Sequence, residues 1–458
     1  MSMHFGSMVV ASLVAAVLGL GCGEASPAMG GGGTAASGGG GDGGAGGAEP
    51  VAVWPLSGVD FDAPSDDLLP FAALVAEASV IGIGESVHTT GGELRMRARL
   101  IRYLVEAEGI RVIVLENEWE ETERTVAPHV DACSGTAEEA AMGLNPVWWD
   151  VSTPRLLAWL CAYNQTHADD PVRVLGMDIR QAWYDHPAVV SYLEAVAPAD
   201  APSVADGTST CLGVGHASRE DFFADPLVQA YFSGGAPLPE ADHQACLAGV
   251  DAAIALFASR RDELIAKSDE RAFERARLRL VGMRAFDTSI YHLSRGDLEL
   301  ANPPRDAAMA DVLLTFQRLE FPDRRAVVFA HDGHVLRRSD EVLAGQWRGV
   351  KNVGTLVAEA LGDAYHAVGQ VSLTTEIDWF GGPQTLDNDQ PGHLEPRLAD
   401  LGHDFALVDT DAATTMGLWM AGTGYEVGFD TLIPAQHYDA LVFHRRSPAA
   451  DYFTPPPF

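Results

Sequence analysis

Residues 78–116 read ASVIGIGESVHTTGGELRMRARLIRYLVEAEGIRVIVLE, which predicts a strand, a helix and a second strand in close succession. The apolar runs at 78–84 and 111–116 are rich in β-branched residues, as buried strands are. Between them, residues 93–107 carry one apolar helical stripe, made of Leu94, Leu100, Ile101, Leu104 and Val105. Gly109 follows as a suitable helix terminator. Because strands joined through a helix are usually parallel, this stretch predicts an α/β fold.

The same alternation of strands and helices continues along the chain. Further strands are predicted at residues 172–177, 326–330, 366–373 and 440–443. Over residues 187–300 helical patterns predominate and strand signals are absent. We therefore expect an α/β fold with a largely parallel sheet flanked by helices, formed by residues 51–186 and 301–458, with an inserted helical cap at 187–300.

The aromatic residues of the predicted cap allow two interpretations. They either line an apolar cleft for a bulky substrate or form the core of the cap itself. These residues are Phe222, Phe223, Tyr231, Phe232, Phe273 and Phe286.

The N-terminal region carries signals for export. Residues 8–20 (MVVASLVAAVLGL) form an apolar run as long as the core of a signal peptide, and Cys22 follows as in a bacterial lipoprotein cleavage site. We therefore expect residues 1–21 to be a signal peptide and residues 22–50 to be a Gly-rich disordered linker. The predicted location is the periplasm or cell envelope, with a possible membrane tether through a lipidated Cys22.

Composition narrows the classes of partner. The 458 residues are 47% hydrophobic and 21% charged, as in ordinary globular proteins. The 64 acidic and 30 basic residues give a formal charge of −34. This balance argues against a nucleic-acid partner, because phosphate contacts need clustered Lys and Arg.

The cysteines beyond Cys22 are even in number, which permits two disulfides in an exported protein without fixing their pairing. Proximity favours Cys133 with Cys161 and Cys211 with Cys246. The sequence has no Cys/His cluster with zinc spacing, so we do not expect a structural zinc site.

Polar residues follow four of the predicted strands at the point where each strand ends. Parallel strands present their carboxyl ends at one edge of a sheet, where ligands bind in open α/β folds. We therefore expect these side chains to lie close together on a rigid platform. They are Glu85 and His88 after the first strand, Glu116 after the second, Asp178 after the third, and His331 with His334 after the fourth.

Each of these residues also has a purely structural interpretation. A carboxylate after a strand commonly caps the next helix, which applies to Asp178 and, less readily, to Glu85 and Glu116. His334 could be a satisfied structural histidine. The coincidence of four strand ends favours a functional site more than any one residue does.

Several motifs, in the same order, resemble the erythromycin esterase family, which includes succinoglycan biosynthesis-like hydrolases. Gly84-Glu85-Ser86-Val87-His88 resembles its G-E-x-x-H motif, and Arg97 with residues 100–104 resembles its R-x-x-L-I-R-x-L helix. Later matches are residues 114–116, the segment from Trp148 to Asn164, residues 175–178, Arg305-Asp306 with Met309-Ala310, residues 330–335, and Tyr438-Asp439-Ala440. The resemblance spans about residues 70 to 450.

The resemblance implies hydrolysis of an ester or lactone without a serine nucleophile, and the sequence has no G-x-S-x-G elbow near a strand end. His88 would act as general base on water, with Glu85 and Glu116 orienting the imidazole or the water. The residues expected to stabilise the oxyanion or protonate the leaving alkoxide are Arg97, His331 and His334. The residues expected to bind substrate are Glu93, Trp148 and Asp178.

Two positions depart from the family pattern. Glu93 lies five residues after His88 rather than four, with Gly91-Gly92 before it. Asp332 stands where the family's H-N-x-H motif has Asn.

Two other classes of function remain open from the sequence. No cofactor is expected for the esterase, but Glu85, His88, Glu116, His331 and His334 could instead hold a divalent metal, as in a metal-dependent hydrolase or a metal- or haem-binding protein. A non-enzymatic surface lipoprotein with an inactive pocket is the third interpretation. The natural ester and the oligomeric state are not specified by the sequence.

Overall fold

The computed structural model describes residues 52–379, 382–428 and 430–456. The predicted signal peptide, Cys22 and the Gly-rich linker lie outside the described residues. No helix in the described ranges is long and apolar enough to cross a bilayer.

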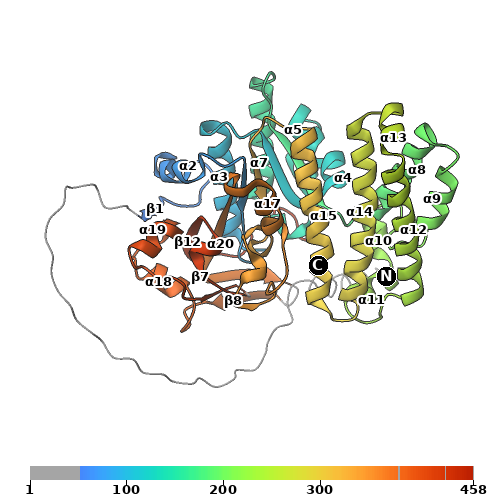
Figure 1. Cartoon of the computed structure of the whole chain (residues 1–458). Helices are drawn as coiled ribbons and strands as arrows, with labels where there is room; N and C mark the ends of the chain where they lie inside the picture. Colours follow the sequence, from blue (N-terminus) through green and yellow to red (C-terminus); the bar gives the residue numbers. More distant parts are fainter. Residues whose placement is uncertain (1–51, 380–381, 429, 457–458) are drawn as a thin grey trace, which may run out of the picture.

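A nine-stranded sheet forms the centre of the described chain (Figure 1). Neighbouring strands are parallel from β12 through β7, β2, β5 and β3 to β4, whereas β1, β8 and β9 pair antiparallel. The predicted fold class, a largely parallel sheet flanked by helices, is confirmed. In spatial order the strands are β1 (Val53–Pro55), β9 (Phe405–Asp409), β12 (Ala440–Ser447), β7 (Tyr365–Trp379), β2 (Val80–Ile83), β5 (Ala326–Phe329), β3 (Val112–Glu118) and β4 (Arg173–Asp178), with β8 (Gly382–Asp387) beside β7.

All six strands predicted from apolar runs are present, but the sequence analysis did not identify β1, β8 or β9. β7 is longer than predicted because its second half, with alternating polar residues, continues into an antiparallel hairpin with β8. A separate small sheet contains β6 (Ala344–Gly345), β10 (Tyr425–Val427) and β11 (Asp430–Leu432).

The alternation of side chains along the central strands divides the core into two layers. Ile81 and Ile113 belong to the layer that contains α3 (Gly91–Ala107) and α7 (Ser152–Thr166). Val80 and Val112 belong to the layer that contains α15 (Leu298–Leu319) and α17 (Val353–Leu361). Helices therefore cover both faces, as the apolar runs of the strands require.

The chain between β4 and β5 is helical, and its outer helices lie to one side of the sheet (Figure 1). Five of the six aromatic residues singled out in this region are buried in its core, and Phe223 packs against that core partly buried. The core interpretation therefore fits these aromatics, and the cleft interpretation does not. The helices are α8 (Ala182–Val196), α9 (Ala201–Thr208), α10 (Arg219–Ala224), α11 (Pro226–Phe232), α12 (Glu240–Ser259), α13 (Arg261–Lys267), α14 (Glu270–Leu293) and α15.

Two disulfides have the pairing that proximity favoured. Cys133–Cys161 ties the end of α5 (Ala127–Ala132) to α7. Cys211–Cys246 ties the segment after α9 to α12 within the cap. Each bridge restricts the unfolded chain and thereby stabilises the fold.

Replacing Cys211 and Cys246 together by Ala is expected to lower the free energy of unfolding by about 3 kcal/mol, because the unfolded chain regains the entropy of a long loop. Urea unfolding of the oxidised proteins measures the difference. Adding a thiol reductant should lower the stability of the wild-type protein at least as far as that of the double variant. Equal stability of the two oxidised proteins would contradict the structural role of this bridge.

Candidate active site

The carboxyl ends of β2, β5, β3 and β4 are adjacent in the sheet, and they bring the predicted site residues together. The imidazoles of His88 and His331 contact each other edge to face, with ring centroids 5.1 Å apart. The rings of His331 and His334 follow at 6.4 Å. Glu116 lies between the last two, accepting a hydrogen bond from the His331 backbone N–H at 2.9 Å.

His88 is bonded to Glu85 in the loop after β2. The Nδ1 atom of His88 contacts Oε1 of Glu85, and the indole N–H of Trp148 donates to the same oxygen at 2.9 Å. Glu85 is fully buried, whereas His88 keeps 7% of its surface exposed. A carboxylate on Nδ1 fixes the ring and leaves Nε2 free to accept a proton.

The loop that carries His88 is held by the chain after β12. Thr89 has a φ of +69°, an unusual conformation for a β-branched residue, and its carbonyl accepts from Ala450 N–H at 2.9 Å. Thr90 Oγ1 lies 2.5 Å from Ser447 Oγ. A Cβ on Gly91 would lie 2.6 Å from the Ala449 carbonyl oxygen, so the close approach of this segment requires glycine.

Glu93 lies behind this loop and supports it. Its carboxylate accepts hydrogen bonds of 2.7 Å from the backbone and the hydroxyl of Ser86 and from the hydroxyl of Ser372. Burial raises the pKa of Glu93 to about 7, although these hydrogen bonds oppose the increase. Its polar atoms are thus engaged within the protein, and substrate contact by Glu93 stays a prediction.

A buried ion cluster centres on Arg305 of α15. Its guanidinium donates to Glu116 Oε1 at 2.7 Å and to Asp178 at 2.8 and 3.1 Å. Burial opposes ionisation of Glu116, but His334 and Arg305 hold the pKa of its carboxyl well below the usual range. Asp178 also binds Arg180 at 2.8 Å, so it positions two arginines; its predicted contact with substrate, like that of Trp148, is untested.

His334 is the second cation of the cluster. Its Nδ1 lies 2.7 Å from Asp306 and its Nε2 lies 3.3 Å from Glu116. Burial lowers the pKa of His334, but the charges of Asp306 and Glu116 outweigh burial and raise the pKa to about 10. The Arg305 Nη1 atom lies 3.2 Å from the same Nε2, a geometry that would suit a neutral ring. We assign the imidazolium because two carboxylates flank the ring.

His331 is neutral. The Gly333 N–H donates to its Nδ1 at 3.0 Å, so the proton of the ring resides on Nε2. Burial and the neighbouring His88 and His334 lower the pKa of His331 to about 3, against a hydrogen bond with the Ser86 backbone. His331 is therefore a hydrogen-bond donor beside the general-base candidate His88.

Arg97 is buried near Glu85, whose charge acts on it. Its guanidinium stacks on Phe329, 4.1 Å from the ring centroid, and donates to Thr153 Oγ1 at 3.0 Å. Burial lowers the pKa of Arg97 to about 10, against the attraction of Glu85 and Asp150. The side chain still carries a positive charge at neutral pH, which balances the buried carboxylate of Glu85.

Two of the alternative metal ligands, Glu85 and Glu116, are bonded to other side chains, and metal dependence stays untested. In the described ranges, no group of three or more His, Cys, Asp and Glu side chains is placed to hold an ion. Glu85 is bonded to His88 and Trp148, and Glu116 is bonded to Arg305. A metal would have to break these contacts and lie beside the Arg305 cation.

Asp332, at the position of the family's Asn, is buried and close-packed. A Cβ on Gly84 would lie 1.7 Å from its Oδ1, and the Gln370 N–H donates to that oxygen at 3.3 Å. Burial and the negative charges of Glu93 and Glu85 raise the pKa of Asp332 well above the usual range. This direction favours the neutral carboxyl, whose charge and shape resemble those of the Asn in the family motif.

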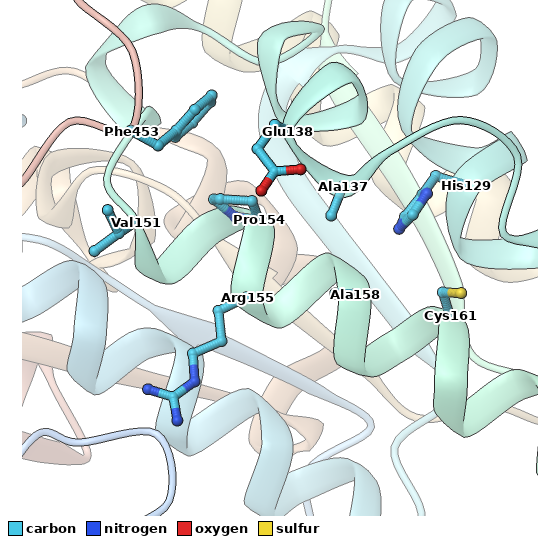
Figure 2. Close-up of a pocket in the computed structure, with 9 residues that line it drawn as sticks. All are labelled: His129, Ala137, Glu138, Val151, Pro154, Arg155, Ala158, Cys161 and Phe453. Atoms are coloured by element: carbon cyan, nitrogen blue, oxygen red, sulfur yellow. The ribbon is translucent and has the colours of Figure 1, made fainter.

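A separate pocket of about 460 Å³ lies beside α7 (Figure 2). None of the predicted site residues lines it, so the chemistry discussed above lies elsewhere. Its lining residues are His129, Ala137, Glu138, Val151, Pro154, Arg155, Ala158, Cys161 and Phe453.

Arg305 and Asp306 were not predicted to have a role, although they belong to one of the motifs quoted above. Their signal was two adjacent charges at the start of an apolar helical run, AAMADVLL. Ser447 was not predicted either; its hydroxyl accepts a hydrogen bond from the Glu93 N–H at 3.2 Å. Nothing in the local sequence around Ser447 indicates this distant contact.

Comparison with known proteins supports one family and one fold. The family model described as erythromycin esterase matches residues 105–447, about three quarters of the chain; the Gly84–His88 loop precedes the matched region. A mutant of the erythromycin esterase EreC in its open conformation is 18% identical, with a TM-score of 0.71 over 88% of this chain and 100% of that one. A Bacillus cereus protein is 19% identical, with a TM-score of 0.70 over 88% and 97%. A succinoglycan biosynthesis protein is 15% identical, with a TM-score of 0.66 over 87% and 95%.

Replacing Asp332 by Asn is expected to preserve activity and to stabilise the protein increasingly as the pH rises. A carboxyl with a raised pKa in the folded state stabilises the fold at low pH and loses that contribution as the pH rises through its folded-state pKa. Melting temperatures are measured between about pH 4 and about pH 9, and that of the wild-type protein should decrease relative to that of the variant as the pH rises. The exposed Asp323→Asn variant is the control, and a constant difference across this range would contradict the neutral state of Asp332.

Proposed function

Because the chain belongs to the erythromycin esterase family, we propose that it hydrolyses an ester or macrolactone with His88 as general base and without a metal. Family membership makes the protein a carboxylic ester hydrolase, and it indicates that the substrate is a small-molecule ester. The observation that carries the mechanism is the contact of His88 Nδ1 with the buried Glu85 carboxylate at the edge of the site.

In the proposed reaction, a water molecule attacks the carbonyl carbon of the ester while its proton passes to Nε2 of His88. The carbonyl electrons move to oxygen and form a tetrahedral oxyanion. When this intermediate collapses, the bond to the alkoxide breaks, and the imidazolium of His88 returns the proton to the leaving oxygen. Glu85 favours the charged ring in both steps, because a buried carboxylate stabilises an adjacent imidazolium.

The neighbouring groups suit this reaction. The ring of neutral His331 contacts that of His88, and its Nε2–H is proposed to turn from the Ser86 backbone to the oxyanion and stabilise it. Arg305 compensates the charge of Glu116, and Asp306 compensates that of His334. Glu116 and His334 are therefore proposed to hold the neighbouring groups in position rather than to exchange protons with the substrate. Arg97 is proposed to act through its charge near Glu85.

Replacing His88 by Ala is expected to lower kcat by about 10²–10⁴-fold, the usual contribution of general-base catalysis. Hydrolysis of erythromycin and of a panel of simpler esters measures the loss.

The control for this variant is His167→Ala, which removes an exposed histidine at the end of α7. It should leave kcat unchanged, and a chelator should leave wild-type turnover unchanged. Activity that survives in His88→Ala would eliminate the general-base role. Activity that a chelator abolishes and zinc or manganese restores would favour the metal-dependent hydrolase, and wild-type protein inactive on every ester would favour a binding protein.

We also propose that the protein is exported and tethered through a lipid on Cys22. The Cys133–Cys161 and Cys211–Cys246 disulfides support this proposal, since disulfides persist in oxidising compartments such as the periplasm. The apolar run at 8–20 before Cys22 supports it from the sequence.

Replacing Cys22 by Ala in the full chain is expected to move the protein from the membrane fraction to the soluble fraction of expressing bacteria without loss of esterase activity. A tether acts on location alone, so the folded domain is unaffected. Fractionation and the mass of the mature N-terminal peptide measure the change, with Ser26→Ala as control. Soluble, unmodified wild-type protein would contradict lipidation.

A further inference from the structure

His129 of α5 carries a buried ring nitrogen that the fold leaves without a partner. The residue is 5% exposed. Its Nδ1 lies 3.2 Å from the carbonyl oxygen of Ser134, which can only accept a hydrogen bond, so in the neutral ring Nδ1 carries the proton. Nε2 is then an acceptor, and within the described part of the chain it has no hydrogen-bond partner. Since a buried acceptor without a donor is costly, packing alone does not explain this residue.

The same ring forms part of the wall of the pocket beside α7. Figure 2 shows His129 next to Ala137 and Cys161, with the far end of its ring directed toward the α7 side of the pocket. The pocket lies between α6 (Ala137–Met142), α7 and the chain after β12, which contributes Phe453. Its volume of about 460 Å³ suits a small-molecule ligand. His129 therefore places an unused acceptor at the wall of a space that can hold a ligand.

The other walls of the pocket are mainly apolar. Val151 is 38% exposed, and covering such a surface favours binding. The ring of Phe453 packs on Trp149, with centroids 6.2 Å apart, which helps to hold it at the wall. The apolar lining residues are Ala137, Val151, Pro154, Ala158 and Phe453. These walls favour an apolar ligand body, and the rings of Pro154 and Phe453 suit an aromatic one.

The charges at the pocket disfavour an ionic ligand. Glu138 is exposed and would repel an anion. Arg155 is also exposed, but it is paired with Asp62 and lies over the Phe61 ring, so its charge is already partly compensated. A cation would lose hydration against the apolar walls, and an exposed carboxylate compensates such a loss poorly. A neutral ligand avoids both costs.

We propose that this pocket is a ligand site for a neutral aromatic alcohol, of which phenol is the simplest, with its hydroxyl donating to Nε2 of His129. A phenolic hydroxyl supplies the donor that Nε2 lacks, and the aromatic ring covers the apolar walls. None of the predicted active-site residues lines the pocket. The site is therefore separate from the candidate active site, and the inference goes beyond the proposed ester hydrolysis.

The test compares phenol with anisole, in which a methyl group replaces the hydroxyl hydrogen, so that anisole can accept but not donate. Binding to the full chain is measured by ligand-observed NMR titration, and the histidine rings are followed in hydrogen–nitrogen correlation spectra. We expect phenol to bind about tenfold more tightly than anisole, as one hydrogen bond to a buried acceptor allows. Phenol should also shift the Nε2 resonance of His129, and His129→Phe should abolish the preference for phenol.

A second variant tests the pocket without touching His129. Ala158 is exposed on α7 and lines the pocket, so Ala158→Trp fills the space without disturbing the core. It should abolish binding of both phenol and anisole and leave the melting temperature unchanged. The controls are Gln165→Trp, at an exposed position of α7 outside the pocket, and His167→Phe, at an exposed histidine. Both should leave the two affinities unchanged.

Equal binding of phenol and anisole, binding of neither, or a preference that survives His129→Phe would overturn the proposal. Tighter binding of benzylamine than of phenol would overturn the neutral class of ligand. Kinetics separate this inference from the proposed function, because phenol should not compete with an ester for the active site. Competition that Ala158→Trp leaves unchanged would place phenol in the active site and overturn the separate pocket. A preference for phenol that depends on His129, in a protein that cleaves no ester, would support the pocket and contradict ester hydrolysis.

Discussion

The guanidinium of Arg305 is the charge on which the geometry of the site depends. It is buried at the ends of β3 and β4, and its bonds to Glu116 and Asp178 compensate the loss of hydration. Removing one partner of such a buried pair typically costs about 3–5 kcal/mol, because the other charge remains without compensation. Glu116 in turn fixes the His331 backbone, and Asp306, the neighbour of Arg305, fixes His334. One helix, α15, thereby sets the positions of both histidines.

The sequence allowed the prediction of those features that depend on local pattern. Apolar runs predicted the six central strands, and the polar residues at their ends predicted the side of the sheet that carries the site. Parallel strands end at the same edge of the sheet, so residues that follow different strands in the sequence lie close together in space. For this reason Glu85, His88, Glu116 and His331 do meet. The short strand β9, which lies between β1 and β12, was missed because its three central apolar residues are too few to separate a strand from a loop.

Features that depend on contacts between distant segments could not be predicted. Arg305 lies 127 residues from Asp178 and 189 from Glu116, so no local pattern relates them. The sequence did not show that the Glu93 carboxylate faces Ser86 and Ser372. Likewise, the sequence allowed a helix-capping role for Asp178, and only the structure shows that its carboxylate binds Arg180 and Arg305.

The anchoring of the His88 loop by the chain after β12 has a consequence for the folding of the newly synthesised chain. Thr90 and Ser447 are separated by 357 residues, so the loop cannot acquire its final shape while the chain is still being synthesised. β12 also fills the centre of the sheet, between β7 and β9, and must insert before the sheet is continuous. Contacts so distant in sequence form late. The incomplete chain is therefore inactive, and the active site forms only when β12, the last strand, is in place.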